Sequence, residues 1–270
     1  GNDLRFSEEK VSASRNFANK IWNAARFILM NIEGKDIDCA LPKKLYTSDK
    51  WILNRFNNVT AGVTENLEKF ELGMAVSKLY DFIWDDFCDW YIELAKIRMN
   101  GADEESADSA RRVLVWTMSN TLKLLHPFMP YITEEIWQTL PHDGEALIVA
   151  KWPEYDEALF FPQEAKNLEN VMALIRAIRT RRNEMNVPPS KKAHIYIDTA
   201  HPAPYEEASE FIARLAYGSK VEIGTGFDVQ GAVTAVTDDA KALLPMDDLV
   251  DKAAETARLN KELANAQKQL

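Results

Sequence analysis

The sequence predicts a mainly α protein: a helical bundle, then a small α+β domain, then the start of a coiled-coil helix. Through the first part of the chain, apolar residues recur at intervals of three and four, the period of an amphipathic helix. From about Ala146 the pattern changes to short apolar runs and alternation, which are typical of strands. We therefore expect a helical bundle at 1–152, an α+β domain at 153–246 and a truncated coiled-coil arm at 247–270.

The composition is that of a folded, water-soluble protein, with 46% hydrophobic and 27% charged residues in a chain of 270. No long apolar run and no basic leader before an apolar stretch is present, so we expect a cytoplasmic protein without a membrane span or signal peptide. Cys39 and Cys88 form no paired motif, and we predict no structural metal. The net charge of −10 opposes nucleic-acid binding by the chain as a whole, so the local charge must decide.

The first predicted helix spans residues 7–31. Ser7 can cap its N-terminus, and two glutamates follow in the first turn, where the helix dipole favours acids. With about 100° of rotation per residue, the apolar residues fall on one half of this helix. The polar half carries Arg15, Asn16, Asn19, Lys20, Asn23 and Arg26.

Four further helices are predicted in the first domain. Proline ends the fourth helix of the domain, because it cannot continue a helix interior. Serine, threonine or acidic residues open most of them. Their expected ranges are 50–70, 72–99, 107–125 and 133–140.

The second domain is predicted to mix strands and helices. We expect strands at 147–149, at 193–198, around Val221 and around Val233, and helices at 162–185 and 206–217. From Asp247 onward, leucines approximate a heptad seam that is too short to form a stable coil alone. The chain opens with Gly1 and ends within this pattern, so we expect a part of a longer protein.

Two segments concentrate positive charge. Residues 10–26 hold four basic residues and no acid, and residues 166–192 hold seven basic residues against two acids. Arginine and lysine could hold phosphates, and asparagine could read a base edge, although a merely solvated helix surface is the alternative. The candidate RNA contacts in these segments are Arg15, Asn19, Lys20, Asn23, Arg26, Arg176, Arg179 and Arg182.

Lys50 and Trp51 open the second predicted helix. An exposed aromatic ring beside a positive charge could stack on an unpaired base, a contact worth about 1–3 kcal/mol. We therefore add both residues to the candidate RNA contacts. A position in the core is the alternative for Trp51.

An acidic run lies on the helix predicted at 72–99. Its spacing fits a solvent face or a ridge that pairs with arginine, and no histidine lies nearby to favour a metal site. The four histidines of the chain are scattered, and no glycine-rich phosphate loop is present, so we predict no catalytic residue. The acids of this run are Asp81, Asp85, Asp86, Asp89 and Glu93.

Four segments of the chain resemble one enzyme family. Arg15–Phe27 looks like the opening helix of the anticodon-binding domain in valyl- and isoleucyl-tRNA synthetases. Phe87–Glu93 and Met185–Lys192 are similar to forms typical of the valyl enzymes, and His126–Trp137 is similar to a signature of the valine, isoleucine and leucine class. The chain therefore resembles the C-terminal part of bacterial-type valyl-tRNA synthetases.

The resemblance implies a fragment that binds the anticodon arm of valine tRNA and catalyses nothing itself. The family attaches valine to tRNA with ATP and Mg in a class I catalytic domain whose signature motifs are absent here, so we expect no cofactor in this chain. Phosphates would contact Arg15, Lys20, Arg26 and Lys50, and unstacked bases would contact Asn19, Asn23 and Trp51. We expect a monomer that binds neither DNA nor membranes.

Two alternatives stay open. The chain could be the equivalent part of an isoleucyl or leucyl enzyme, although isoleucyl relatives commonly carry a zinc-binding cysteine cluster that is absent here. It could instead be a helical scaffold that oligomerises through its coiled coil, with solvated basic faces.

Overall fold

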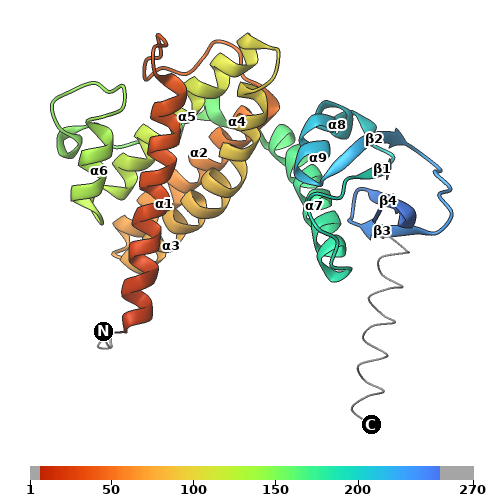
Figure 1. The fold of residues 1–270 in the computed structure, drawn as a ribbon. Helices are drawn as coiled ribbons and strands as arrows, with labels where there is room; N and C mark the ends of the chain where they lie inside the picture. Colours follow the sequence, from red (N-terminus) through yellow and green to blue (C-terminus); the bar gives the residue numbers. More distant parts are fainter. Residues whose placement is uncertain (1–6, 250–270) are drawn as a thin grey trace. The chain divides into compact units, whose positions relative to one another are not determined.

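The computed structural model describes residues 7–249 and divides the chain into two compact units, with the division between Ala165 and Lys166 (Figure 1). This division lies later in the chain than the boundary expected near Trp152, because the residues that follow Trp152 pack on the first unit. Helix α7 (Pro162–Glu184) runs across the division. Of the arm expected at 247–270, residues 250–270 lie outside the described residues.

Unit 1 is the predicted helical bundle. The helix predicted at 72–99 is unbroken, but its central ten residues wind as a π-helix. The elements of unit 1 are α1 (Glu8–Ile32), α2 (Thr47–Glu68), α3 (Leu72–Asp81), the π-helix η1 (Phe82–Tyr91), α4 (Ile92–Met99), α5 (Glu104–Leu125), α6 (Pro130–Trp137) and the 3-10 turns η2 (Leu147–Val149) and η3 (Glu157–Leu159). These bounds confirm the helices predicted for the first domain.

The strand predicted at 147–149 is wrong. These residues form the 3-10 turn η2, in which Leu147 is buried while Ile148 and Val149 are exposed. A strand needs a neighbour to satisfy its backbone N–H and C=O groups. The four strands of the described chain all lie between residues 193 and 245, and none pairs with η2.

A buried guanidinium lies in the core of unit 1. Arg98, at the end of α4, is only 8% exposed. Its Nη1 lies 2.5 Å and its Nη2 3.0 Å from the two carboxylate oxygens of Asp49 on α2. Its other N–H groups donate to the Ser48 hydroxyl (2.9 Å) and to the hydroxyl (2.9 Å) and carbonyl (2.8 Å) of Ser106. All five N–H groups of this side chain therefore have an acceptor.

The Asp49 carboxylate is satisfied as fully as its partner. It accepts hydrogen bonds from the Tyr91 hydroxyl at 2.7 Å, the Ser109 hydroxyl at 2.8 Å and the Tyr46 backbone N–H at 3.0 Å. Burial, followed by the nearby Asp49 charge, raises the pKa of Tyr91 well above its usual value. One carboxylate thus connects α2 with η1, α4, α5 and the loop before α2.

A strap, residues 152–164, lies against α2. The Asn57 side chain donates to the Asp156 carbonyl at 2.9 Å and accepts from the Asp156 N–H at 2.8 Å. A neighbouring strand would satisfy the same two backbone groups of Asp156. The Asn54 side-chain oxygen accepts from the Phe161 N–H at 2.9 Å. These buried amides replace the backbone partners that an irregular segment lacks, and they explain why the strap belongs to unit 1.

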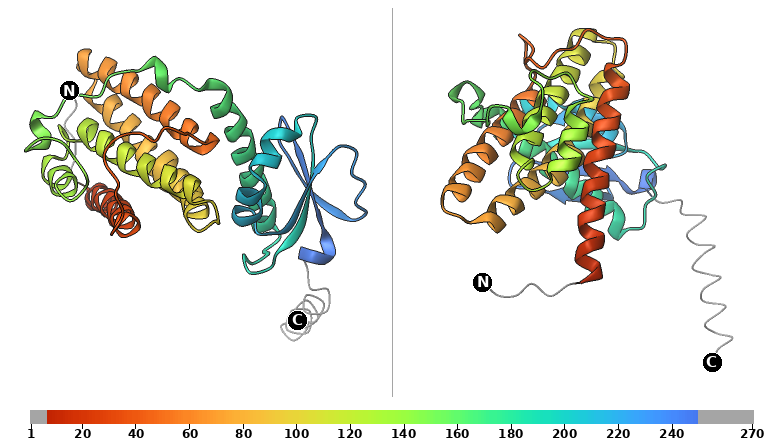
Figure 2. Two further views of the ribbon diagram at one scale, coloured as in Figure 1. Left: turned by 90° about the horizontal axis from the view of Figure 1, so that it is seen from above. Right: turned by 90° about the vertical axis from the view of Figure 1, so that its left-hand side faces the viewer.

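Unit 2 is the predicted α+β domain. Its mixed sheet has the strand order β2-β1-β4-β3, with β1 and β2 parallel and the other neighbours antiparallel. Helices cover one side of the sheet (Figure 2), and alternate residues of β1 are buried. The further elements are β1 (Ala193–Asp198), α8 (Pro202–Glu207), α9 (Ser209–Leu215), β2 (Gly218–Gly224), β3 (Ala232–Val236), β4 (Lys241–Pro245) and α10 (Met246–Leu249).

Three of the strands predicted for this domain are confirmed, and two details differ. The helix predicted at 206–217 is the pair α8 and α9. The sequence predicted no strand at the position of β4, although β4 lies in the middle of the sheet between β1 and β3. No helix within residues 7–249 is both long and apolar enough to cross a membrane.

The substitution Asp49→Asn should lower the free energy of unfolding of unit 1 by about 3–5 kcal/mol, because it leaves the buried Arg98 without its counter-ion. Urea denaturation followed by tryptophan fluorescence measures this, since all seven tryptophans lie at or before Trp152 in unit 1. The control Glu65→Gln removes an exposed ion pair with Lys69 and should cost less than about 1 kcal/mol. Equal losses in the two variants would contradict a central role for the buried pair.

The substitution Asn57→Leu should release the strap, because two hydrogen bonds to Asp156 disappear and its backbone groups lose their partners. We expect a loss of about 1–3 kcal/mol and faster amide hydrogen exchange at Asp156. The neighbouring, exposed Asn58→Leu is the matched control and should change neither quantity. Unchanged exchange at Asp156 in the Asn57 variant would show that other contacts hold the strap.

Candidate nucleic-acid interface

Helix α1 presents a polar stripe to solvent. Arg15, Asn19, Asn23 and Arg26 are all exposed and follow one another at helical spacing. The opposite side of the helix is buried in the bundle through Phe17, Ile21, Ala24, Ala25 and Ile28. The division of this helix that the sequence predicts is therefore present in the structure.

The groups on this stripe are available to a ligand. Among residues 7–249, neither Arg15 nor Arg26 has an acid as a partner, and the Asn19 and Asn23 amides have no hydrogen-bond partner. A free guanidinium can bind a phosphate through two parallel hydrogen bonds, and a free amide offers both a donor and an acceptor. We name these four residues the α1 face.

Lys20 lies beside the α1 face but is already paired. Its Nζ is 2.5 Å from the Asp89 carboxylate and 4.4 Å from the centre of the Trp84 ring. Trp84 stacks on Tyr80 with ring centres 5.6 Å apart, and Tyr80 stacks on Phe17 of α1 at 4.8 Å. A phosphate at Lys20 would have to compete with Asp89 for the ammonium group.

The acidic run on α3, η1 and α4 is in part a pairing ridge. Besides Asp89, Asp86 accepts from Arg55 of α2 at 2.8 Å, and Glu93 pairs with Lys96 at 2.6 Å. These acids therefore compensate basic side chains of the bundle. Such pairs contribute no net charge, so the net charge of −10 comes from other acids of the chain.

The prediction that Trp51 stacks on a base is wrong. Its side chain is 1% exposed and belongs to the core of the bundle. The first turns of α2 are buried on most sides, and the buried residues there include Ser48, Asp49, Ile52 and Leu53. Asp49 forms an ion pair with Arg98 at this place. Long-range pairing of this kind leaves no local signal in the sequence.

Lys50 is used inside unit 1. Its Nζ lies 2.8 Å from the Glu164 carboxylate, and the side chain is about one-third exposed. The hydrogen bond from Lys50 lowers the pKa of Glu164 below its usual value. Lys50 therefore fastens the end of the strap, and a phosphate at this position would have to displace Glu164.

The three arginines predicted to bind RNA in unit 2 differ from one another. Arg176 is exposed, and Arg179 is half-buried with its Nε donating to the Leu215 carbonyl at 2.6 Å. Arg182 is only 2% exposed, so the prediction that it contacts RNA directly is wrong. Helical spacing places Arg182 on the apolar stripe of Val171, Ile175 and Ile178. This spacing was the signal in the sequence that could have revealed its burial.

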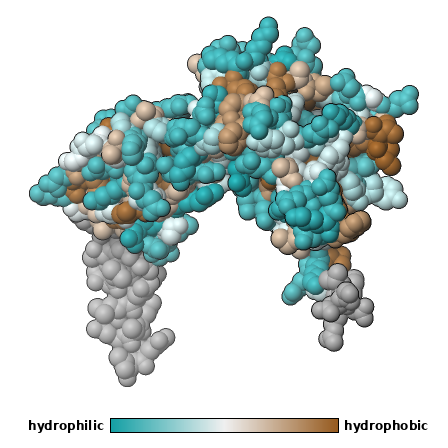
Figure 3. Space-filling model, turned by 180° about the vertical axis from the view of Figure 1, so that it is seen from behind, coloured by the Kyte–Doolittle hydropathy of each residue, from teal (hydrophilic) through white to brown (hydrophobic). Residues whose placement is uncertain are grey.

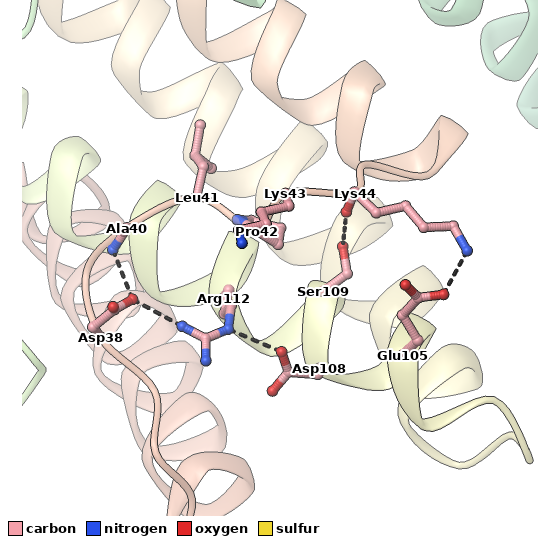
Figure 4. A pocket seen from close by; sticks show the side chains of 10 residues that line it. All are labelled: Asp38, Ala40, Leu41, Pro42, Lys43, Lys44, Glu105, Asp108, Ser109 and Arg112. Atoms are coloured by element: carbon pink, nitrogen blue, oxygen red, sulfur yellow. Dashed lines mark hydrogen bonds and ion pairs between the residues drawn. The ribbon is translucent and has the colours of Figure 1, made fainter.

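The pocket in Figure 4 lies between the loop before α2 and helix α5, with a volume of about 420 Å³. Arg112 pairs with Asp38 and with Asp108 at 2.9 Å each, and Lys44 pairs with Glu105 at 2.6 Å. These charged side chains neutralise one another. The pocket therefore provides a weaker case for an anionic ligand than the α1 face does.

Hydrophilic residues predominate on the face of the molecule drawn in Figure 3. The hydrophobic residues described on that face form separate small areas. Obligate oligomers usually bury a larger continuous apolar surface. The scaffold alternative places its contacts in the coiled-coil arm, of which residues 250–270 lie outside the described residues, so this face does not test it.

Comparison with known proteins identifies the relatives of this chain. The family described as the anticodon-binding domain of tRNA ligase matches residues 49–197. Valine–tRNA ligase of Bacillus licheniformis is 44% identical over 266 residues, which are 96% of this chain and 30% of that protein. Valine–tRNA ligase of Listeria monocytogenes is 44% identical over 277 residues, which are 100% of this chain and 31% of that protein.

The chain thus spans about 30% of the length of these curated relatives. A solved LeuRS-tRNA-LeuAMS ternary complex of Agrobacterium radiobacter is 17% identical, with a TM-score of 0.45 over 58% of this chain and 18% of that one. A likeness this weak supports no further inference.

Proposed function

Because the chain belongs to the family of anticodon-binding domains of tRNA ligases, we propose that it binds the anticodon arm of a tRNA through the α1 face. The observation that carries this proposal is the set of exposed, unpaired groups on α1. The arginines Arg15 and Arg26 hold backbone phosphates, and the asparagines Asn19 and Asn23 contact base edges. Helix α1 precedes the family match but lies within the region aligned with the Listeria relative.

The proposed RNA is valine tRNA. The 44% identity with two bacterial valine–tRNA ligases supports this choice. In the intact enzyme, valine would be joined to its tRNA with ATP and Mg bound by parts of the protein outside this chain. Such a role agrees with a cytoplasmic monomer, and sedimentation of the chain without RNA tests the monomeric state.

The role of the chain in this proposal is positioning. Binding energy at the anticodon arm would orient the distant acceptor end of the tRNA toward the catalytic site. Acids that face basic partners within the bundle, such as Asp86 with Arg55, do not oppose RNA at the α1 face. The local charge of the α1 face is positive, because Arg15 and Arg26 have no acid partner among residues 7–249, so a net charge of −10 does not exclude an RNA ligand there.

Arg15→Ala and Arg26→Ala should each flatten the dependence of valine-tRNA affinity on salt by about one phosphate contact. Fluorescence anisotropy across a salt series measures this slope, with isoleucine tRNA as the competitor. Lys69→Ala is the control, because this exposed lysine is paired with Glu65 and should leave the slope unchanged. Equal affinity for both tRNAs would argue against valine specificity. Unchanged salt slopes in both arginine variants would show that the α1 face does not contact the RNA phosphates.

Asp89→Asn should tighten RNA binding and steepen the salt slope by about one contact, because it frees the Lys20 ammonium group from its acidic partner. The matched control is Asp85→Asn on the same π-helix, which alters an exposed acid without a partner among the described residues. Weaker binding in the Asp89 variant would mean that the ion pair holds Lys20 in its binding position.

A further inference from the structure

Arg182 lies beneath the turn that leads from α7 into the sheet. The side chain is 2% exposed, on the last turn of α7. Its Nη2 donates to the Pro188 carbonyl at 3.1 Å and also to the Lys191 carbonyl. Its guanidinium carbon is 5.4 Å from the centre of the Tyr217 ring. Arg182 thus connects the end of α7 to both ends of a short turn.

The charge of Arg182 has no counter-ion in the described part of the chain. Among residues 7–249 no carboxylate forms an ion pair with Arg182, and its Nε and Nη1 are buried without an acceptor there. Burial lowers the pKa of this guanidinium, but an arginine stays charged at neutral pH. A buried, uncompensated cation is costly, and an apolar side chain of similar length would avoid the cost. Apolar packing therefore does not account for an arginine here, and its hydrogen bonds to the Pro188 and Lys191 carbonyls indicate a role at the turn.

The turn that Arg182 holds is preorganised. The Lys191 N–H donates to the Pro188 carbonyl at 3.1 Å, and Pro189 occupies the position where its fixed φ favours a β-turn. The N–H groups of Ser190 and Lys192 have no acceptor among the described residues. We name residues 188–192 the Pro188–Lys192 turn.

The surroundings of the Pro188–Lys192 turn are positive. Ser190 and Lys192 are exposed, Lys191 is half-exposed, and no acid occurs between residues 185 and 193. Of two nearby acids, Glu184 is neutralised by Arg181 at 2.9 Å, whereas Asp248 keeps its charge and accepts from the backbone N–H of His194 at 2.9 Å. The turn therefore combines free N–H donors, a hydroxyl and two ammonium groups above a buried cation.

We propose that the Pro188–Lys192 turn binds a phosphate of an RNA backbone and gives unit 2 its own contact with tRNA. This inference rests on the proposed tRNA-binding function. Backbone N–H groups in a turn, aided by lysines, are a general way to hold a phosphate. Arg182 touches no ligand here. It is a positioning residue, which holds two carbonyl groups of the turn inward and adds positive potential beneath it.

An extended polyanion fits this turn better than a small phosphate compound. The donors lie on an exposed turn, so the sugar-phosphate backbone of an RNA can pass over them without entering a cavity. A free phosphate would meet the same chemistry, so the experiment needs a separate titration with inorganic phosphate.

The test uses the 270-residue chain with the double variant Lys191→Gln/Lys192→Gln. Its salt slope for valine tRNA should fall by about one to two phosphate contacts. The control Lys220→Gln/Lys241→Gln removes two exposed lysines from strands β2 and β4 and should keep the slope. A wild-type slope in the Lys191/Lys192 variant, with a lowered slope in Arg15→Ala, would overturn the turn contact and leave the proposed function standing.

Amide chemical shifts of Ser190 and Lys192 during titration with inorganic phosphate provide the second readout. Shifts together with a lowered RNA slope support the backbone contact, whereas shifts with an unchanged RNA slope identify a free-phosphate site and overturn it. If the wild-type chain binds no tRNA, the proposed function and the RNA contact both fail.

The positioning role of Arg182 is tested with Arg182→Met, which keeps the apolar stem and removes the charge. The salt slope should fall as in the lysine double variant, while the urea midpoint of unit 2, followed by the NMR amide signals of strand β1, stays close to that of the wild type. A lowered midpoint with an unchanged slope would mean that Arg182 is only structural. The lysine double variant decides the turn contact even if Arg182→Met does not fold.

Discussion

The ion pair between Asp49 and Arg98 fixes the elements against which the rest of unit 1 packs. It binds α4 to α2, and its further bonds reach η1 through Tyr91 and α5 through Ser109. A buried pair stabilises a fold only when every donor and acceptor is satisfied, and both partners meet that condition here. Because η1 is fixed in this way, its Trp84 offers a defined surface to α1.

The exposure of the α1 face follows from this arrangement. Phe17 stacks on Tyr80, and Lys20 lies over Trp84 and pairs with Asp89, so one side of α1 is held against α3 and η1. A helix whose rotation is fixed on one side has its other side fixed too, which leaves Arg15 and Arg26 toward solvent. Packing in the core therefore decides which cations of a negatively charged chain stay free.

The sequence predicted those features that depend on local periodicity. The helix bounds and the polar half of α1 follow from the 3.6-residue repeat, and β1 follows from alternation. Features that depend on distant partners were missed. Trp51 is buried because the start of α2, with Asp49 and its partner Arg98, packs inside the bundle, and the apolar run at η2 is no strand because no segment of residues 7–249 pairs with it. Strand β4 is defined by its two neighbours in the sheet rather than by its own short pattern.

The two buried arginines, Arg98 and Arg182, have opposite electrostatic environments. This difference distinguishes an arginine that stabilises the fold from one that we propose aids the binding of an anion. Arg98 pairs with the Asp49 carboxylate, and all five of its N–H groups donate to an acceptor. Its electrostatic field is therefore cancelled within the bundle, and little of it reaches solvent. Among residues 7–249, Arg182 contacts two carbonyl groups and the Tyr217 ring, and two of its nitrogens have no acceptor. No acid of the described residues cancels its charge, which lies beneath a turn that carries two lysines, in a low-dielectric region where fields are screened least. An uncompensated cation at such a place adds to the attraction of an anion at the surface, which an equally well-packed apolar side chain could not do.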